Sequence, residues 1–221
     1  MSARIERNTS SSLTTATILV AHPDDETLWA GGFVLEHAAW DWFIGTLCRG
    51  SDPDRAPKFV RVLERLHARG AMLDMDDGPE QRPLPALDVQ HQVLTLLPDI
   101  HFEMLLTHGP QGEYTWHRRH VEVCQAVVAL WRAGQISVDA LWLFAYEDGE
   151  RQYLPHAVQN AHIYQPLSQE VWRTKLDLMT EVYGFHPESW EARTTPRAEA
   201  FWCFESPHLL DRWLREKGLT V

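Results

Sequence analysis

The chain of 221 residues has few cysteines and no long apolar run. Its three cysteines, Cys48, Cys124 and Cys203, are far apart and outside any CxxC spacing, which argues against a disulfide framework. They are predicted to be free thiols in a reducing compartment, and the protein is predicted to be cytoplasmic. No stretch approaches the roughly 18 apolar residues of a membrane span. Residues 1–14 lack the apolar segment of a signal peptide and are predicted to form a flexible arm.

Basic residues are also in deficit. Twenty lysines and arginines stand against thirty-one acidic residues, a net charge of −11. This balance argues against nucleic acid or an anionic membrane as the partner, and favours a small molecule. No GxGxxG follows the first apolar run and no GxSxG is present, which disfavours a dinucleotide binder and a serine hydrolase. A homo-oligomer is compatible with the sequence.

Strand-like and helix-like segments alternate along the first two thirds of the chain. The strand-like runs are 17–20, 42–48, 71–73, 102–107 and 140–145, and the amphipathic segments between them are 27–37, 58–69, 87–97 and 117–131. This order predicts a Rossmann-like, three-layer α/β/α fold with a mainly parallel sheet, in a single domain over residues 1–221. The remainder is less regular, with strands expected at 162–164 and 201–204 and helices at 169–183 and 209–217.

The most informative stretch is AHPDDE at 21–26, between the first strand and the first helix. Carboxylates on one turn raise each other's pKa, and a bound cation would relieve that cost. His22 with Asp25 is a usual ligand pair for a hydrolytic metal. The alternative is an acidic helix start, stabilised by the helix dipole, and Glu26 fits that role best. A further ligand elsewhere in the chain is needed to decide between the two.

Histidines follow the fourth predicted strand. His108 ends that strand, and His117 and His120 stand at i and i+3 at the start of the next helix. Because the carboxyl ends of parallel strands meet at one edge of the sheet, these histidines are expected near His22. Together with His22 and the pair Asp24–Asp25, these histidines provide a His/Asp/His set. Zinc hydrolases bind their metal with such a set of three protein ligands and keep the fourth position open for water.

The AHPDDE turn and the HxxH about a hundred residues later resemble the LmbE-like (PIG-L) family of zinc-dependent N-deacetylases. The resemblance follows the element order over most of the chain and is specific at these two motifs. It implies an LmbE-like fold and a Zn²⁺ ion, or another divalent metal such as Fe²⁺, bound by His22, Asp25 and His120. It also implies that Asp24 is the general base and that His117 stabilises the oxyanion or donates a proton.

The chain departs from the family pattern at two places. Tyr114 corresponds to a tyrosine that assists catalysis in some members, but it stands three residues before His117 instead of two. Many members have an acidic residue inside HxxH, where this chain has Arg118 and Arg119. A carboxylate that orients an active-site histidine must therefore come from elsewhere.

Other polar residues fall in loops where a substrate should bind. Arg55 and Arg82 either contact a sugar hydroxyl or carboxylate or belong to the solvated surface. His108 is either a substrate or supporting contact or a structural histidine, and Glu113 either bonds a substrate hydroxyl or caps its loop. Pro187, Trp190 and the stretch Arg193–Arg197 are candidates for a cleft wall.

The predicted function is a metal-dependent amidohydrolase that removes the acetyl group from an N-acetylglucosamine-containing conjugate. A deacylase of another acylated amine, such as a glycopeptide or a thiol conjugate, would need the same metal site. A non-catalytic sugar-binding protein with this fold is a third hypothesis. The intact set of His22, Asp24, Asp25, His117 and His120 argues against it, since a degenerate copy is expected to lose at least one of them.

Overall fold

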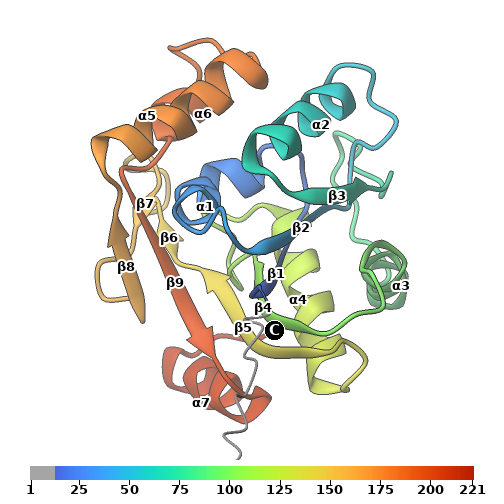
Figure 1. The fold of residues 1–221 in the computed structure, drawn as a ribbon. Helices are drawn as coiled ribbons and strands as arrows, with labels where there is room; N and C mark the ends of the chain where they lie inside the picture. Colours follow the sequence, from blue (N-terminus) through green and yellow to red (C-terminus); the bar gives the residue numbers. More distant parts are fainter. Residues whose placement is uncertain (1–12) are drawn as a thin grey trace, which may run out of the picture.

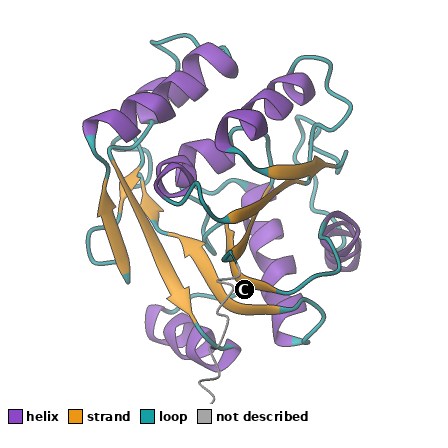
Figure 2. Ribbon diagram, viewed as in Figure 1, coloured by secondary structure: helices purple, strands orange, loops and turns teal. Residues whose placement is uncertain are grey.

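The computed structural model describes residues 13–221, and a seven-stranded sheet is its centre (Figure 2). The strand order is β3-β2-β1-β4-β5-β9-β8. The strands are β1 (Thr15–Val20), β2 (Asp41–Thr46), β3 (Arg69–Met72), β4 (Phe102–Thr107), β5 (Val138–Phe144), β8 (Ile163–Pro166) and β9 (Ala198–Phe204). β6 (Tyr146–Glu147) and β7 (His156–Ala157) form a separate pair. The helices are α1 (Asp25–Glu36), α2 (Arg55–Leu66), α3 (Ala86–Leu96), α4 (Arg118–Arg132), α5 (Gln169–Asp177), α6 (Trp190–Thr194) and α7 (Pro207–Lys217), with a π-helical turn, η1 (Leu178–Val182), after α5.

The first five strands are parallel, as predicted. β1 pairs with β2 on one side and β4 on the other, β3 adds to β2, and β5 adds to β4. β9 then runs antiparallel to β5, and β8 antiparallel to β9. The predicted mainly parallel sheet is therefore confirmed, with an antiparallel extension at one edge.

Helices cover both faces of the sheet (Figure 1). Side chains alternate between the faces of a strand. Ile18 and Val20 of β1 pack in the core that includes α1, α2 and η1, whereas Leu19 and Ala21 pack in the core that includes α3, α4 and α7. A strand buried on both faces reads as a continuous apolar run, which is why β1 is visible in the sequence. The three-layer architecture is confirmed.

Several element boundaries differ from the predictions. α2 begins at Arg55 instead of residue 58, because the Asp52 carboxylate accepts the Arg55 N–H at 2.9 Å and starts the helix early. The single helix predicted over 169–183 is an α-helix to Asp177 and a π-helical turn beyond it. β6, β7 and α6 were not predicted, since two to five residues carry too little periodicity to detect.

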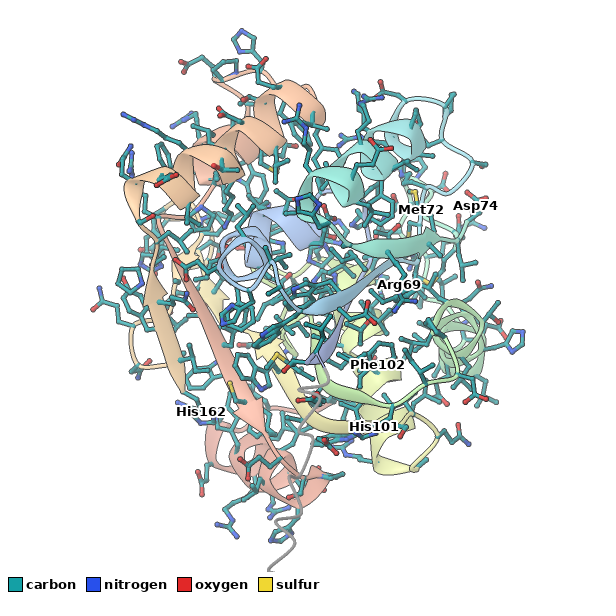
Figure 3. All side chains as sticks on the ribbon, viewed as in Figure 1. Arg69, Met72, Asp74, His101, Phe102 and His162 are labelled. Carbon is teal, nitrogen blue, oxygen red and sulfur yellow. The ribbon has the colours of Figure 1, made fainter. Side chains whose placement is uncertain are left out.

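The topology defines one crevice at the carboxyl edge of the parallel strands. β1 lies between β2 and β4, so the loops after β1 and β4 leave the sheet in opposite directions and open a gap between them. The loop after β3 reaches the same edge. Figure 3 labels Arg69 and Met72 at the two ends of β3 and Asp74 just beyond, where this loop begins. Within residues 13–221, no helix is long and apolar enough to cross a membrane.

Candidate metal and active site

The turn after β1 separates its carboxylates. The His22 N–H donates to Asp25 Oδ2 at 2.9 Å, so Asp25 folds back toward His22. Asp24 has φ 120° and ψ −30°, a backbone conformation that residues other than glycine rarely adopt. Its N–H donates to the Glu26 carboxylate at 2.9 Å, which helps to hold this strained conformation. Asp25 therefore contacts histidines, whereas Asp24 Oδ2 accepts from Arg55 at 2.8 Å.

His22, Asp25 and His120 bring three donor atoms together. His22 Nδ1 lies 3.1 Å from Asp25 Oδ2, His120 Nε2 lies 3.3 Å from that same oxygen, and the two nitrogens are 3.3 Å apart. Three ligand atoms bound tetrahedrally to one ion at about 2.0–2.1 Å would lie about 3.3 Å from each other. The triangle of these atoms therefore fits a divalent metal ion. His117 adds a further nitrogen within 4.8 Å of those of His22 and His120.

Glu113 connects two of the histidines from behind. It is fully buried, and its Oε2 lies 2.6 Å from His120 Nδ1 and 2.9 Å from His108 Nδ1. The Ala21 N–H donates to His108 Nε2 at 2.9 Å, so that nitrogen has the lone pair and Nδ1 has the proton. A carboxylate facing His120 Nδ1 likewise directs the lone pair of Nε2 toward Asp25 and His22. His108 is thus a fully buried support of this network and does not line the cavity described below.

Asp77 supports His22 in the same way. Asp77 Oδ1 lies 3.2 Å from His22 Nε2, the ring nitrogen that does not face His120. Arg49 donates to Asp77 Oδ2 at 2.6 and 2.9 Å, and Gln81 donates to Oδ1 at 2.7 Å. These bonds fix the carboxylate that orients the His22 ring.

Arg119, inside the HxxH motif, anchors the loop that carries Asp77. Its buried guanidinium donates to the carbonyls of Asp76 at 2.5 Å and Arg82 at 3.0 Å. Arg82 thus joins the network through its backbone, and its exposed side chain does not line the cavity. The structure therefore does not bring the Arg82 side chain to the site, because the loop turns the carbonyl of that residue toward Arg119.

The charges around the triangle shift the pKa of each histidine. Burial lowers the pKa of His22 and of His120, but the neighbouring carboxylates have the larger effect. Asp25 and Asp77 raise the pKa of His22 to about 9. Asp25 and Glu113 raise the pKa of His120 to about 10. Burial and the charge of His120 lower the pKa of His117 to about 3. The carboxylates thus create a site that attracts positive charge, which a metal ion can supply in place of protons.

Asp24 differs from its neighbour. Burial and the charge of Asp25 raise the pKa of Asp24 well above its ordinary value, and Arg55 only partly offsets them. The net effect on Asp25 is opposite, because His120 and His22 outweigh its burial and lower its pKa. Two adjacent carboxylates with pKa values pushed apart suit different tasks, one as a permanent anion and one as a proton acceptor.

A cavity of about 270 Å³ opens in front of these groups. Tyr114 and Arg55 line it, and the Tyr114 ring centroid lies 5.7 Å from that of His117 and 4.8 Å from that of Trp190. The lining residues are His22, Pro23, Asp24, Asp25, Leu28, Arg49, Arg55, Asp77, Tyr114, His117, Trp190 and Glu191.

His117 is the N-cap residue of α4 and not its first helical residue, with an extended backbone at φ −96° and ψ 115°. Its ring centroid still lies 4.3 Å from that of His120. Nδ1 of His117 is buried and has no hydrogen-bond partner among the described residues. Asp77 and Glu113 are thus the carboxylates that orient His22 and His120, and within residues 13–221 no carboxylate bonds to Nδ1 of His117.

Sequence reasoning missed Asp77, Arg49 and Glu191, and it left Glu113 undecided. Asp77 belongs to a loop with several acidic residues and no periodicity, so nothing local distinguishes it. The position of Glu113 offered a signal, because it lies in the loop between His108 and His117. Polar groups that such a loop buries need hydrogen-bond partners, and a carboxylate in the same loop can provide them.

No family model matches the chain. An uncharacterised protein, L374, of Acanthamoeba polyphaga mimivirus is 22% identical over 165 residues, which are 67% of this chain and 69% of the viral protein. Among solved structures, the N,N'-diacetylchitobiose deacetylase of Pyrococcus horikoshii superimposes with a TM-score of 0.65 at 15% identity, over 90% of this chain and 86% of that one.

Two further structures extend the comparison. The zinc-inhibited form of the teicoplanin deacetylase Orf2 has a TM-score of 0.62 at 12% identity, over 87% of this chain and 99% of its own. The 4-carboxy-2-hydroxymuconate hydratase GalB of Pseudomonas putida has a TM-score of 0.60 at 14% identity, over 86% and 96%. The LmbE-like α/β fold implied by the resemblance is therefore confirmed. The same fold also supports a hydratase, so the reaction has to be argued from the site.

Proposed function

We propose that the protein is a metal-dependent deacetylase of N-acetylated amino sugars, most specifically of N-acetylglucosamine conjugates. The observation that carries the proposal is the triangle of His22 Nδ1, Asp25 Oδ2 and His120 Nε2, with sides of 3.1, 3.3 and 3.3 Å, at the base of a cavity. The fold shared with two deacetylases supports the reaction type.

His22, Asp25 and His120 would hold the metal ion, with Asp77 and Glu113 fixing the two imidazole rings. When bound, a divalent ion supplies a Lewis acid and lowers the pKa of a water molecule to about 7. We propose Zn²⁺, and Fe²⁺ as the alternative, since nitrogen and oxygen donors accept both.

Asp24 is proposed as the general base. It lines the cavity, is not part of the donor triangle, and has a raised pKa, which makes it a stronger base than an ordinary carboxylate for the proton of the attacking water. Arg55, 2.8 Å from Asp24 Oδ2, stabilises the ionised form before that transfer.

His117 is proposed to stabilise the oxyanion. A pKa lowered to about 3 keeps the imidazole neutral at pH 7, so it acts as a hydrogen-bond donor and not as an imidazolium acid. The protonated Asp24 then remains to return the proton to the leaving amine, as microscopic reversibility allows.

The cavity constrains the substrate. Its volume of about 270 Å³ is just below the range of about 300–1,000 Å³ that is typical of small-molecule sites, so we propose that one sugar ring enters. Trp190, which is 38% exposed, and Tyr114 offer aromatic faces to the ring, and Glu191 and Arg49 offer polar groups to its hydroxyls.

The experiment is a screen of N-acetylglucosamine conjugates with zinc-loaded and iron-loaded protein, measuring released acetate. Glycopeptide and acylated thiol conjugates are included to detect a deacylase of another specificity. Asp24→Asn should reduce the turnover of the substrate found by at least 100-fold, since a positioned general base contributes about 10²–10⁴-fold. Full activity of Asp24→Asn would refute the assigned base. Tight sugar binding without turnover would favour a non-catalytic sugar-binding protein.

A further inference from the structure

A second and larger cavity, of about 740 Å³, lies beside the candidate active site and shares one structural element with it. α6 contributes to both. Trp190 and Glu191 line the catalytic cavity, whereas Ala192, Arg193 and Thr194 line the second one. The other walls of the second cavity come from β7, β8, α5 and the segment before β9. Figure 1 shows α5 and α6 together at one end of the molecule, above β7 and β8.

The charge of this second cavity contrasts with that of the chain. No aspartate or glutamate of residues 13–221 lines it, although the chain has a net charge of −11. Arg193, Arg197 and His156 do line it. Among the described residues Arg193 makes no ion pair, and Arg197 donates one hydrogen bond, to Gln169 Oε1 at 3.1 Å. Most of the guanidinium donors are thus open to a ligand, and guanidinium groups match carboxylate and phosphate oxygens.

Two aromatic residues, Trp172 and Tyr164, line the cavity. The Arg197 guanidinium carbon lies 3.5 Å from the centre of the Trp172 ring, and the indole donates to the Thr195 carbonyl at 3.2 Å. Tyr164, on β8, is 39% exposed. The volume is within the range of about 300–1,000 Å³ that is usual for small-molecule sites.

We propose that this cavity binds a small organic anion with a flat apolar body, such as an aryl carboxylate or an aryl phosphate. Its acidic group pairs with Arg193 and Arg197, and its ring lies against Tyr164 and Leu176, since the Arg197 guanidinium already covers one face of Trp172. The binding itself does not depend on the proposed reaction.

Isothermal titration calorimetry with phenyl phosphate and with benzoate tests the proposal, with benzyl alcohol as the uncharged probe. We expect submillimolar binding of the two anions and at least tenfold weaker binding of the alcohol. Arg193→Gln and Arg197→Gln should each weaken the anions by about tenfold, as expected for the loss of a charged hydrogen bond. Arg65→Gln, an exposed arginine of α2, is the matched control and should bind like the unaltered protein.

Anions could also enter the catalytic cavity, where Arg49 and Arg55 lie, so Arg55→Gln is titrated in parallel. Loss of anion binding in Arg55→Gln, together with unchanged binding in Arg193→Gln and Arg197→Gln, would overturn the proposal. It would also be overturned if millimolar phenyl phosphate and benzoate gave no heat of binding with the unaltered protein.

Discussion

Replacing Glu113 by glutamine tests the network behind the proposed metal site. In the unaltered protein, one oxygen of Glu113 accepts from the Nδ1 atoms of His120 and His108, at 2.6 and 2.9 Å, and the other accepts from the Gly109 N–H at 2.8 Å. A glutamine has the same shape but one acceptor oxygen. Its NH₂ group must therefore face either the Gly109 N–H or the two histidines, and at least one buried donor loses its acceptor.

Two magnitudes follow. A carboxylate behind a metal-binding histidine typically contributes 10–100-fold to metal affinity, so Glu113→Gln should weaken Zn²⁺ binding by about that factor, or about 1.4–2.7 kcal/mol. The lost charged hydrogen bond should also lower the free energy of unfolding of the metal-free protein by about 1.5–3 kcal/mol.

Zinc affinity is measured by competition with a chromogenic chelator, and stability by urea unfolding in the presence of a strong chelator. Glu64→Gln, on the exposed face of α2, is the control and should change neither quantity. If Glu113→Gln binds zinc within twofold of the unaltered protein while its stability falls, the carboxylate is structural only. The assigned orientation of His120 would then be wrong.

Three further predictions concern stability and reactivity. Burial and its contact with Glu26 raise the pKa of Tyr183 well above 10, so the unfolded chain loses this proton first and stability falls as the pH rises above about 10. The free energy of unfolding in urea should therefore decrease less between pH 8 and pH 11 in Tyr183→Phe than in the unaltered protein, whereas Tyr153→Phe, at a half-exposed residue, should behave like the unaltered protein. The same decrease in the unaltered protein and both variants would contradict the assignment. Cys48 and Cys124 are buried, which raises the pKa of both thiols, whereas Cys203 is only half-buried. At most one thiol per chain, that of Cys203, should therefore react with a disulfide reagent within minutes at pH 8, whereas all three should react in urea. Rapid reaction of more than one thiol in the folded protein would argue against the burial of Cys48 and Cys124. Gly70→Ala would bring a Cβ against the Ile44 carbonyl between β3 and β2. We expect this clash to lower the midpoint of urea unfolding by the equivalent of about 1–3 kcal/mol, and Ala68→Gly, which adds no atoms, is the nearby comparison. An unchanged midpoint in Gly70→Ala would show that β3 can shift away from β2.

Part of the molecule could be predicted from local sequence. Strands buried on both faces are apolar runs, and the helices between them have one apolar stripe, so their alternation predicted the parallel sheet and its element order. The same order placed the end of β1 and the start of α4 at one edge, which is why His22, Asp25 and His120 could be proposed as a set before any distance was known. Their roles remain predictions, but the distances among them are now defined.

Only the tertiary structure decided what surrounds those residues. Asp77, Glu113 and Arg49 reach the site from three different loops, and contacts between segments so far apart leave no periodic trace in the sequence. Arg82 and Arg55 look alike in sequence, but the first presents its carbonyl to Arg119 and the second its guanidinium to Asp24. The direction of a loop side chain depends on the backbone path of that loop. Packing against other elements sets that path, and the residue types alone do not.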